Sequence, residues 1–252
     1  MSDSEGADTA SRLRSTLTGH EHGIWSLATA VVDGRPVAVA VAVTGSQDET
    51  VRIWDLSNGR PVGGPLVGHN GFSYNGEVWS VATAVVDGRP VAISGGGSNL
   101  IQMWDLATGR HVSEPLDQGI GRMCAVATTV LDRRPVAVTG HADGAVRVWD
   151  LATGRTAAEP LEAHAEVGAV TTAVVGSRLI ALVGSGDGTV RIWDPVTSRP
   201  IGEPLEGHKG MIWGAATTLV DGRPVAVTGS NDKTVRVWDL TGLAAPARGH
   251  TG

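Results

Sequence analysis

The sequence predicts an all-β fold made of five repeated units, and three observations point to it. The dipeptide Trp-Asp recurs at intervals of 50, 45, 44 and 45 residues, and a fixed period in this range is typical of a repeat architecture. Hydrophobic residues make up 41% of the chain, which is enough for a packed core. The apolar segments are short, bounded by turn residues and without helical period, as in β-strands. The five units end at Asp55, Asp105, Asp150, Asp194 and Asp239.

Each unit is expected to contain four short antiparallel strands, which the first unit illustrates. Residues 24–31 are apolar and rich in β-formers, and Asp33-Gly34 then favours a two-residue turn. Residues 37–45 and 51–54 are expected to form the next two strands, and residues 61–66 the fourth. Proline recurs in the fourth segment of most units, which confines that segment to a sheet edge. Such units, repeated radially, make a five-bladed β-propeller.

A second residue pair, Gly-His, recurs with the same period. It stands at Gly19-His20, Gly68-His69, Gly207-His208 and Gly249-His250. Gly-His followed by Trp-Asp at this spacing resembles the WD-repeat β-propeller family, and the Asp-Gly-Arg-Pro turns are similar to bacterial arrays of that family. The resemblance covers residues 12–252. Residues 1–11 are acidic and polar, and we expect them to be a disordered tail.

Ring closure is where the sequence departs from the family pattern, because propellers of this family commonly have about seven blades. Residues 12–17 can add an outer strand to the fifth blade, since Leu17-Thr18-Gly19-His20 matches Leu66-Val67-Gly68-His69. We expect this N-terminal strand to close a five-bladed ring and to remove its exposed sheet edges. Two alternatives remain open. Residues 243–248 supply the strand instead, or the ring is an open arc that associates with another chain.

Histidine, hydroxyl, aspartate and tryptophan side chains recur together and bear on catalysis. The set in the first blade is His20, Thr44, Asp48 and Trp54, and the set in the fifth blade is His208, Thr228, Asp232 and Trp238. The family resemblance implies a structural tetrad, hydrogen-bonded from the indole through the hydroxyl and the imidazole to the carboxylate. A hydrolase triad uses similar residues, but an enzyme needs one site, whereas a structural network is needed in every blade.

The sets in blades 2, 3 and 4 are incomplete. Ser98 takes the place of the aspartate in blade 2, and blade 3 lacks the histidine. In blade 4 Val183 replaces the hydroxyl residue, whereas His164 is kept. We interpret His111 and His141 as loop residues outside these networks. A buried polar network specifies packing only when every member has its partner, so blades 2–4 are predicted to be softer than blades 1 and 5.

One position in each inner strand is predicted to line the mouth of the central channel. Counting from the turns gives Trp25, Trp79, Cys124, Gly168 and Trp213. Tryptophan is enriched at interaction hot spots, so Trp25, Trp79 and Trp213 are candidate partner-binding residues. The alternative is that the indoles only pack between neighbouring blades.

The loop after His69 carries the single phenylalanine and the single tyrosine of the chain. These are Phe72 and Tyr74, and Glu77 follows them. We expect the three residues to form one partner-binding patch with Trp79, since a polar, glycine-flanked loop is an unusual place for core aromatics. The alternative is that the two rings fold down as a plug.

Composition and motifs argue against several classes of function. A net charge of −6 argues against nucleic-acid binding, and the longest apolar run, residues 37–43, is too short to cross a membrane. Cys124 is the single cysteine, so no internal disulfide can form, and with no secretory signal we expect a cytoplasmic protein. The sequence has no phosphate loop, nucleophile elbow or metal-ligand spacing, so we expect no cofactor, no metal and no enzymatic activity.

The sequence therefore predicts a non-enzymatic scaffold that binds a protein or peptide through the acidic face around the channel mouth. The alternative is a small ligand or glycan that stacks on the channel-mouth tryptophans. A broad apolar patch would favour the protein partner, and a deep cleft with converging polar groups would favour the small ligand. Self-association is expected if the ring is open.

Overall fold

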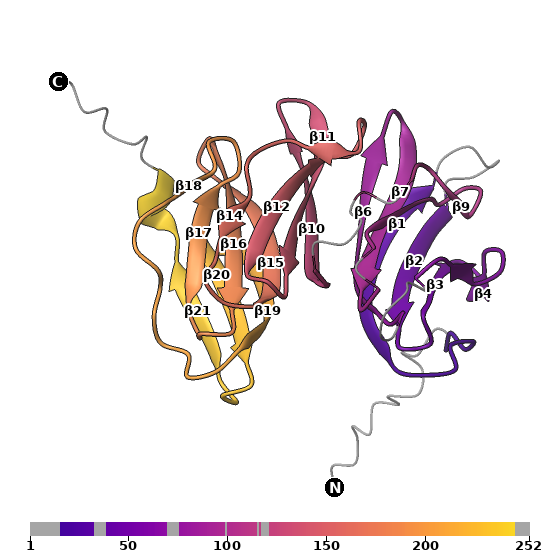
Figure 1. Cartoon of the computed structure of the whole chain (residues 1–252), viewed down its shortest axis with the longest axis horizontal. Coiled ribbons are helices and arrows are strands. Elements are labelled where there is room, and N and C mark those ends of the chain that lie inside the picture. The colour runs from indigo at the N-terminus through magenta and orange to yellow at the C-terminus, as the bar shows by residue number, and fades with distance from the viewer. Residues whose placement is uncertain are drawn as a thin grey trace, which may run out of the picture.

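The computed structural model describes residues 16–32, 39–69, 76–98, 100–114, 116 and 121–244. Within these ranges the chain forms five antiparallel sheets, which follow one another along the sequence as an arc of blades (Figure 1). The helical element of this part of the chain is one 3-10 turn, η2 (Thr241–Ala244). No helix among the described residues is long and apolar enough to cross a membrane.

Three long strands form the body of each blade. The inner strands, which contact one another from blade to blade, are β1 (Ile24–Val32), β6 (Val78–Val86), β10 (Met123–Leu131), β15 (Val167–Val175) and β19 (Ile212–Val220). The second strands are β2 (Val39–Ser46), β7 (Arg89–Gly96), β11 (Arg134–His141), β16 (Arg178–Ser185) and β20 (Arg223–Ser230). The third strands, which end in Trp-Asp, are β3 (Thr50–Asp55), β8 (Gln102–Asp105), β12 (Ala145–Asp150), β17 (Val190–Asp194) and β21 (Val235–Asp239).

The outer strand of each blade is short or interrupted, which differs from the continuous fourth strand expected over residues 61–66. In blade 1 two short strands, β4 (Arg60–Pro61) and β5 (Leu66–Val67), pair with the two ends of β3. The Gly63-Gly64-Pro65 bend lies between them and takes part in no strand. The corresponding strands are β9 (Arg110–His111) in blade 2, β13 (Arg155–Thr156) and β14 (Leu161–Glu162) in blade 3, and β18 (Arg199–Pro200) in blade 4.

Two-residue turns join the inner strands to the second strands. Asp87-Gly88 and Asp221-Gly222 have positive φ at both residues, with values of 49° and 75° in each turn. This is the type I′ conformation, which glycine adopts without steric cost and which suits the twist of a hairpin. Arg133 adopts a φ of 65° at the position of the glycine, so blade 3 holds a non-glycine residue in the left-handed region.

The aspartate of each Trp-Asp pair has a local role in the turn that follows it. The Oδ1 atom of Asp55 accepts the backbone N–H of Ser57 at 2.8 Å, and Asp105, Asp150, Asp194 and Asp239 accept the N–H two residues on at 2.7–3.0 Å. An aspartate that captures this N–H stabilises a tight turn. The recurrence of aspartate after tryptophan is therefore explained by the turn between the third and outer strands.

The core is divided among the junctions between neighbouring blades, and each junction holds its own apolar cluster. Every cluster includes a residue in or just before the third strand of one blade and the first residue of the next inner strand. These pairs are Val51 with Val78, Ile101 with Met123, Val146 with Val167, and Val190 with Ile212. The fold is therefore held together by blade-on-blade contacts, as in other repeat arrays.

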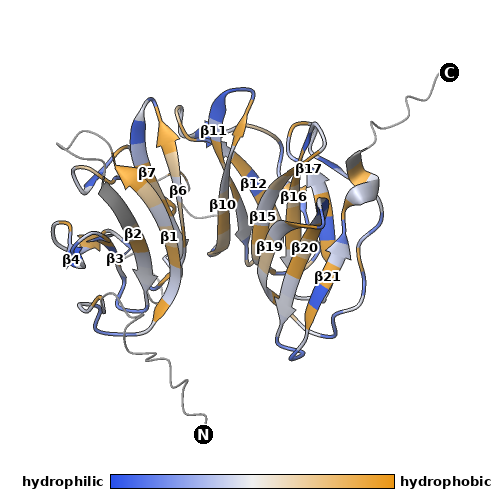
Figure 2. Ribbon diagram, turned by 180° about the vertical axis from the view of Figure 1, so that it is seen from behind, coloured by the Kyte–Doolittle hydropathy of each residue, from blue (hydrophilic) through white to orange (hydrophobic). Residues whose placement is uncertain are grey.

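The two ends of the arc lack such a neighbour. Val235 and Val237 of β21 are 70% and 64% exposed, and Ile24 and Leu27 of β1 are 52% and 67% exposed. Hydrophobic and hydrophilic bands alternate along β21, the last strand of the arc (Figure 2). The closed five-bladed ring that we expected is therefore not confirmed among the described residues, because the apolar faces at the two ends of the arc stay exposed.

The expected closing strands are also not formed in the part of the chain that the structure describes. Blade 5 has three described strands, β19, β20 and β21. Residues 16 and 17 belong to no strand, whereas residues 12–15 lie outside the described residues. Of the C-terminal alternative, residues 243 and 244 belong to η2, and residues 245–248 lie outside the described residues.

Candidate functional site

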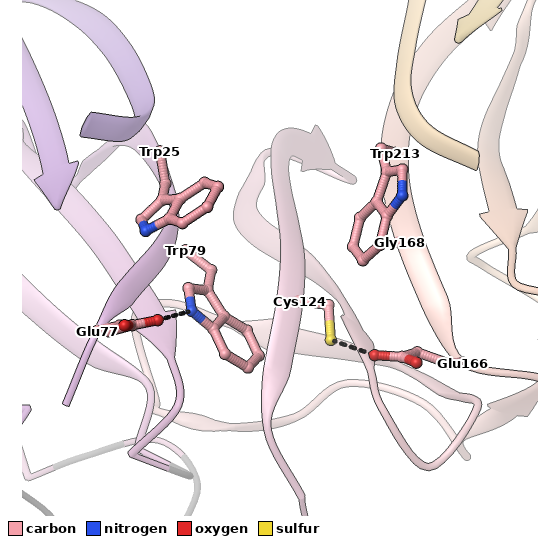
Figure 3. Close-up of a pocket in the computed structure, with 7 residues that line it drawn as sticks. All are labelled: Trp25, Glu77, Trp79, Cys124, Glu166, Gly168 and Trp213. Atoms are coloured by element: carbon pink, nitrogen blue, oxygen red, sulfur yellow. Dashed lines mark hydrogen bonds between the residues drawn. The ribbon is translucent and has the colours of Figure 1, made fainter. Parts of the chain in front are cut away.

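A cavity of about 640 Å³ lies where the first parts of the inner strands meet. All five positions predicted at the channel mouth line it, and Glu77 and Glu166 line it as well (Figure 3). The residues from the five inner strands are Trp25, Trp79, Cys124, Gly168 and Trp213. Residues that are far apart in the sequence thus converge because each blade contributes the same strand position.

The three tryptophans of the channel mouth differ in how far they are buried between blades. Trp25 is 60% exposed and Trp213 is 58% exposed, whereas Trp79 is half-buried. Trp79 Nε1–H donates a hydrogen bond to Glu77 Oε2 at 3.0 Å, which fixes the orientation of its ring. Trp25 and Trp213 therefore present most of their indole surface to solvent.

Two carboxylates give the channel mouth a negative character. Of the described residues that line the cavity, Glu77 and Glu166 are acidic and none is basic. Cys124 Sγ lies 3.7 Å from Glu166 Oε1. Burial, together with the charge of Glu166, raises the pKa of the Cys124 thiol to about 12. The thiol is therefore protonated at neutral pH, and the carboxylates set the charge of the cavity.

Arg122 lies beside the cavity, with its guanidinium group over the ring of Trp79. Its guanidinium carbon is 5.5 Å from the centre of the Trp79 ring. A cation at this distance from an indole face is attracted by the ring quadrupole. No three histidine, cysteine or carboxylate side chains gather as metal ligands in the described ranges.

Phe72 and Tyr74, the loop aromatics expected to extend this surface, lie outside the described residues. Glu77 and Trp79, which follow that loop, are described and lie together at the cavity. The patch that we expected from Phe72, Tyr74 and Trp79 therefore stays a prediction.

The side chains expected to form tetrads meet in blades 1 and 5. Trp54 Nε1–H donates to Thr44 Oγ1 at 2.9 Å, Thr44 Oγ1 lies 2.7 Å from His20 Nε2, and His20 Nδ1 lies 2.8 Å from Asp48 Oδ2. In blade 5 the same chain runs through Trp238, Thr228, His208 and Asp232 with distances of 2.8–2.9 Å. Every member has a partner, so each chain is a complete network that is partly buried.

The aspartates of these tetrads also bind the loop that precedes the inner strand. Asp48 Oδ2 accepts the backbone N–H of Glu21, and Asp232 Oδ2 accepts that of Lys209. Burial opposes ionisation of Asp48, but hydrogen bonds from Thr50, His20 and Glu21 outweigh it and hold the pKa of Asp48 well below its ordinary value. Two ordered loops thus depend on an ionised carboxylate and a histidine that holds it in place.

Comparison with protein families identifies a family for this chain. The WD domain, G-beta repeat family matches residues 11–55, 156–194 and 198–239, which together make up half of the chain. The chain belongs to the WD40 repeat family. No curated protein matches the chain significantly. WD40 repeats generally act as scaffolds for protein–protein interaction.

Two WD40 blades fill their networks in ways that the sequence interpretation missed. In blade 2, His69 Nδ1 lies 3.1 Å from Ser98 Oγ, and Ser94 joins His69 to Trp104. In blade 3, His141 takes the place of the missing histidine, with its Nε2 2.8 Å from Thr139 Oγ1. His141 is buried, so our interpretation of it as a loop residue was wrong.

The signal for His141 was present in the strand pattern. His141 stands two residues after Thr139 in β11, and side chains two apart in a strand point to the same face. His111 is exposed, as expected of a residue outside the networks, but it lies in β9 and not in a loop, and its ring stacks on Trp104 with a distance of 4.0 Å between ring centres. The softness predicted for blade 2 thus has no gap in the network to support it, whereas in blade 3 His141 Nδ1 lies 3.5 Å from the Gly121 oxygen and is not hydrogen-bonded to Asp143, which binds Ala145 and Arg147 instead.

In blade 4 the indole of the Trp-Asp pair lacks its hydroxyl partner. Trp193 Nε1 is buried without a hydrogen-bond partner among the described residues, because Val183 stands where other blades have a hydroxyl. His164 is exposed and has a positive φ of 63°, so it does not replace the missing interaction. Asp187 binds Thr189 and Arg191 within its own hairpin.

Proposed function

We propose that this WD40 protein is a non-enzymatic scaffold that binds a protein or peptide at the channel mouth. In this proposal a lysine or arginine side chain of the partner enters the cavity. The observation that carries it is the composition of the cavity wall, which combines three tryptophans with two carboxylates.

The exposed indoles supply apolar contact area. Trp25 and Trp213 each keep more than half of their surface free, and burial of a tryptophan is among the largest single contributions at protein interfaces. A cavity of about 640 Å³ can hold a long side chain together with part of its backbone. The same wall is too small to accept a folded domain, so the partner presents a loop or a terminal segment.

The carboxylates supply the preference for a cation. Glu77 and Glu166 lie on opposite sides of the cavity (Figure 3), and a cation between them is attracted by both and by the indole faces. The position of Arg122 over Trp79 supports this preference, because one face of that indole already binds a guanidinium. An acidic partner segment would meet two like charges.

The state of the cysteine and histidine side chains that could act as nucleophiles or bases favours a binding role over catalysis. Cys124 is held as a protonated thiol by its raised pKa of about 12, and a thiol must ionise to attack. Both ring nitrogens of His20 and of His208 are hydrogen-bonded within the tetrads, so neither is free to act as a base. A protein with one cysteine and no disulfide also fits the cytoplasm, where we place it.

A peptide array tests this proposal. We expect the wild-type protein to select peptides that contain lysine or arginine, and we expect Trp79→Ala and Trp213→Ala to weaken that binding by about 30-fold, as loss of a hot-spot aromatic does. Arg89→Ala, at the first residue of β7 and thus at the other end of that strand from the cavity, is the matched control. Selection of acidic or neutral peptides, or binding that the tryptophan variants leave unchanged, would contradict the proposal.

A small ligand or glycan is the second candidate, and the size of the cavity favours it. Small-molecule sites commonly measure about 300–1,000 Å³, and exposed indoles are good stacking surfaces for sugar rings. A glycan array with the same variants separates the two candidates. Tryptophan-dependent binding of oligosaccharides without binding of any peptide would favour this second function.

A further inference from the structure

The four junctions between neighbouring blades share one construction. A glycine of the second strand faces a large apolar side chain at the start of the next inner strand, and a methyl group added at the glycine would lie within 2.6 Å of that side chain. The pairs are Gly45 with Val78, Gly95 with Met123, Gly140 with Val167, and Gly184 with Ile212. All four apolar partners are 0–1% exposed. Each junction thus has a recess on one blade and a matching side chain on the next.

The two ends of the arc carry the halves of a fifth such pair. Gly229 has nothing within 4 Å of an added methyl group, so its recess is empty. Ile24, the residue that corresponds to Ile212, is 52% exposed. We name Gly229, Val235 and Val237 the tail face, and Ile24 and Leu27 the head face. The tail face has the recess and the head face has the side chain that fits it.

The residues around each half are the ones that junctions bury elsewhere. Val235 is 70% exposed, whereas its counterpart in blade 4, Val190, is 0% exposed. Leu27 is 67% exposed, whereas its counterpart in blade 2, Val81, is 5% exposed. Burial of apolar side chains of this size is favourable, so both end faces favour a covering partner.

Hydrogen bonds between inner strands give the arc a direction. Thr83 Oγ1–H donates to the backbone oxygen of Thr29, and Thr128, Thr172 and Thr217 each donate in the same way to the threonine of the preceding blade. At the ends of this series, the Thr29 hydroxyl and the Thr217 carbonyl have no such partner within the described ranges. The head face thus ends in a donor, and the tail face ends in an acceptor.

We infer that the head face of one copy of this chain docks on the tail face of a second copy. A second copy fits because it carries both halves of the junction, in nearly the same residues as the junction between blades 4 and 5. Gly229 would receive Ile24 as Gly184 receives Ile212, and Thr29 would donate to Thr217 of the other copy. The partner must match an apolar side chain, a recess and a hydrogen-bond direction at once.

The predicted assembly is head-to-tail, so the two docked faces differ and each added copy brings another free face. Such an interface closes into a ring if the rotation allows it and otherwise extends as an open chain. In both cases the mass rises with concentration in steps of 25.9 kDa. Contact between the two faces within one chain would instead leave the protein monomeric at every concentration.

Two substitutions block one face each without entering the core. Gly229→Arg fills the empty recess of the tail face, and Leu27→Glu places a charge on the head face. Leu27 is chosen because Ile24 adjoins Trp25 of the channel mouth. Gly64→Arg, at an exposed glycine with open space around it, and Val174→Glu, at a residue that is 66% exposed on an inner strand, are the matched controls.

Analytical ultracentrifugation of the full chain over a wide concentration range is the measurement. We expect the wild type and both controls to associate, and we expect Gly229→Arg and Leu27→Glu alone to stay monomeric. A mixture of the two blocked variants should form dimers and nothing larger, because one supplies a free head face and the other a free tail face. Circular dichroism checks that each variant is folded.

Several results would overturn the inference. A wild type that is monomeric throughout, blocked variants that associate as the wild type does, or a mixture that stays monomeric would each do so. The peptide binding proposed above is independent of this outcome, because neither substituted residue lines the cavity. Loss of self-association with intact peptide selection would therefore leave that proposed function in place.

Discussion

Trp193 is the residue at which this fold leaves a visible defect. In the other four blades the indole N–H of the Trp-Asp pair donates a hydrogen bond to a hydroxyl oxygen at 2.7–2.9 Å. The hydroxyl residues are Thr44, Ser94, Thr139 and Thr228. In blade 4 the corresponding side chain is Val183, and Trp193 Nε1 is buried without a partner among the described residues. A buried donor without an acceptor costs free energy that a nearby hydroxyl would recover.

We therefore expect Val183→Thr to stabilise the protein by about 1 kcal/mol, the usual net value of one hydrogen bond. Threonine matches valine in shape, and its hydroxyl would stand where Thr44 and Thr228 hold theirs. Urea unfolding measures the change. Val183→Ala, which adds no hydroxyl, should destabilise the protein, and the gain should vanish when Val183→Thr is combined with Trp193→Phe. A gain that survives in that background would refute this explanation.

Two buried histidines make stability depend on pH. Burial, with His111 nearby, lowers the pKa of His69 to about 4, and burial, with Arg147 nearby, lowers that of His141 to about 4. The ordinary value of 6.5 returns on unfolding, so between pH 6.5 and 4 the unfolded chain binds more protons than the folded one. The free energy of unfolding must therefore fall as the pH decreases through this window.

The expected loss is up to about 3 kcal/mol per histidine, from the size of the pKa shift. Urea unfolding at a series of pH values from 6.5 to 4 measures it, and His69→Gln should flatten the dependence. Asp48 and Asp232 affect stability in a separate pH range, because their pKa values in the folded protein lie below the ordinary value of 3.8. Their contribution to the free energy of unfolding is therefore lost only as the pH falls below about that ordinary value. The same dependence in the wild type and in His69→Gln would exclude His69 as a cause.

Among the elements of the blade, the inner strands could be predicted closely from the sequence, since residues 24–31 were expected and β1 runs from Ile24 to Val32. Alternation and turn residues are local, so they define such a strand well. The outer strand could not be predicted in the same way. Residues 61–66 read as one apolar segment, but β4 and β5 pair only with the ends of β3, and the bend between them depends on that pairing.

Glycine substitutions in the second strand test whether the glycine recess is needed at the blade junction. Gly184→Ala places a methyl group 2.5 Å from Ile212 Cγ2, whereas Gly229→Ala meets nothing within 4 Å. We expect Gly184→Ala to destabilise the monomer by about 1–3 kcal/mol, the usual cost of overpacking, and Gly229→Ala to leave it nearly unchanged. Thermal unfolding at low protein concentration compares the two. Equal losses would show that glycine is needed for the strand and not for the junction.

At the scale of the whole molecule, stability should vary along the arc. Blades 2, 3 and 4 have a junction on each side, whereas blades 1 and 5 have one. Because a repeat array is stabilised mainly by contacts between neighbours, we expect the amides of β21 to exchange faster than those of β12. Hydrogen exchange of Gly229→Arg measures this without self-association. Uniform protection of β12 and β21 would contradict the junction-based account.

Closure is the property of the whole molecule that the sequence could not predict. Matching Leu17-Thr18-Gly19-His20 to Leu66-Val67-Gly68-His69 favoured a clasp, but a closed ring also requires five blades to complete a full turn. That rotation is set by side-chain packing at each junction and leaves no mark in a local motif. The channel-mouth positions could be predicted because they need only the strand register, which repeats in every blade.

The repeated junction also bears on how a chain of this kind can change in length. Because each blade joins the next through the same glycine recess and apolar side chain, tandem duplication of one unit, such as residues 167–211, would insert one new junction and disturb none. Each such event would add one inner strand and therefore one more wall position at the channel mouth. Blade number and cavity lining can thus change together, in whole steps, by gene duplication or loss.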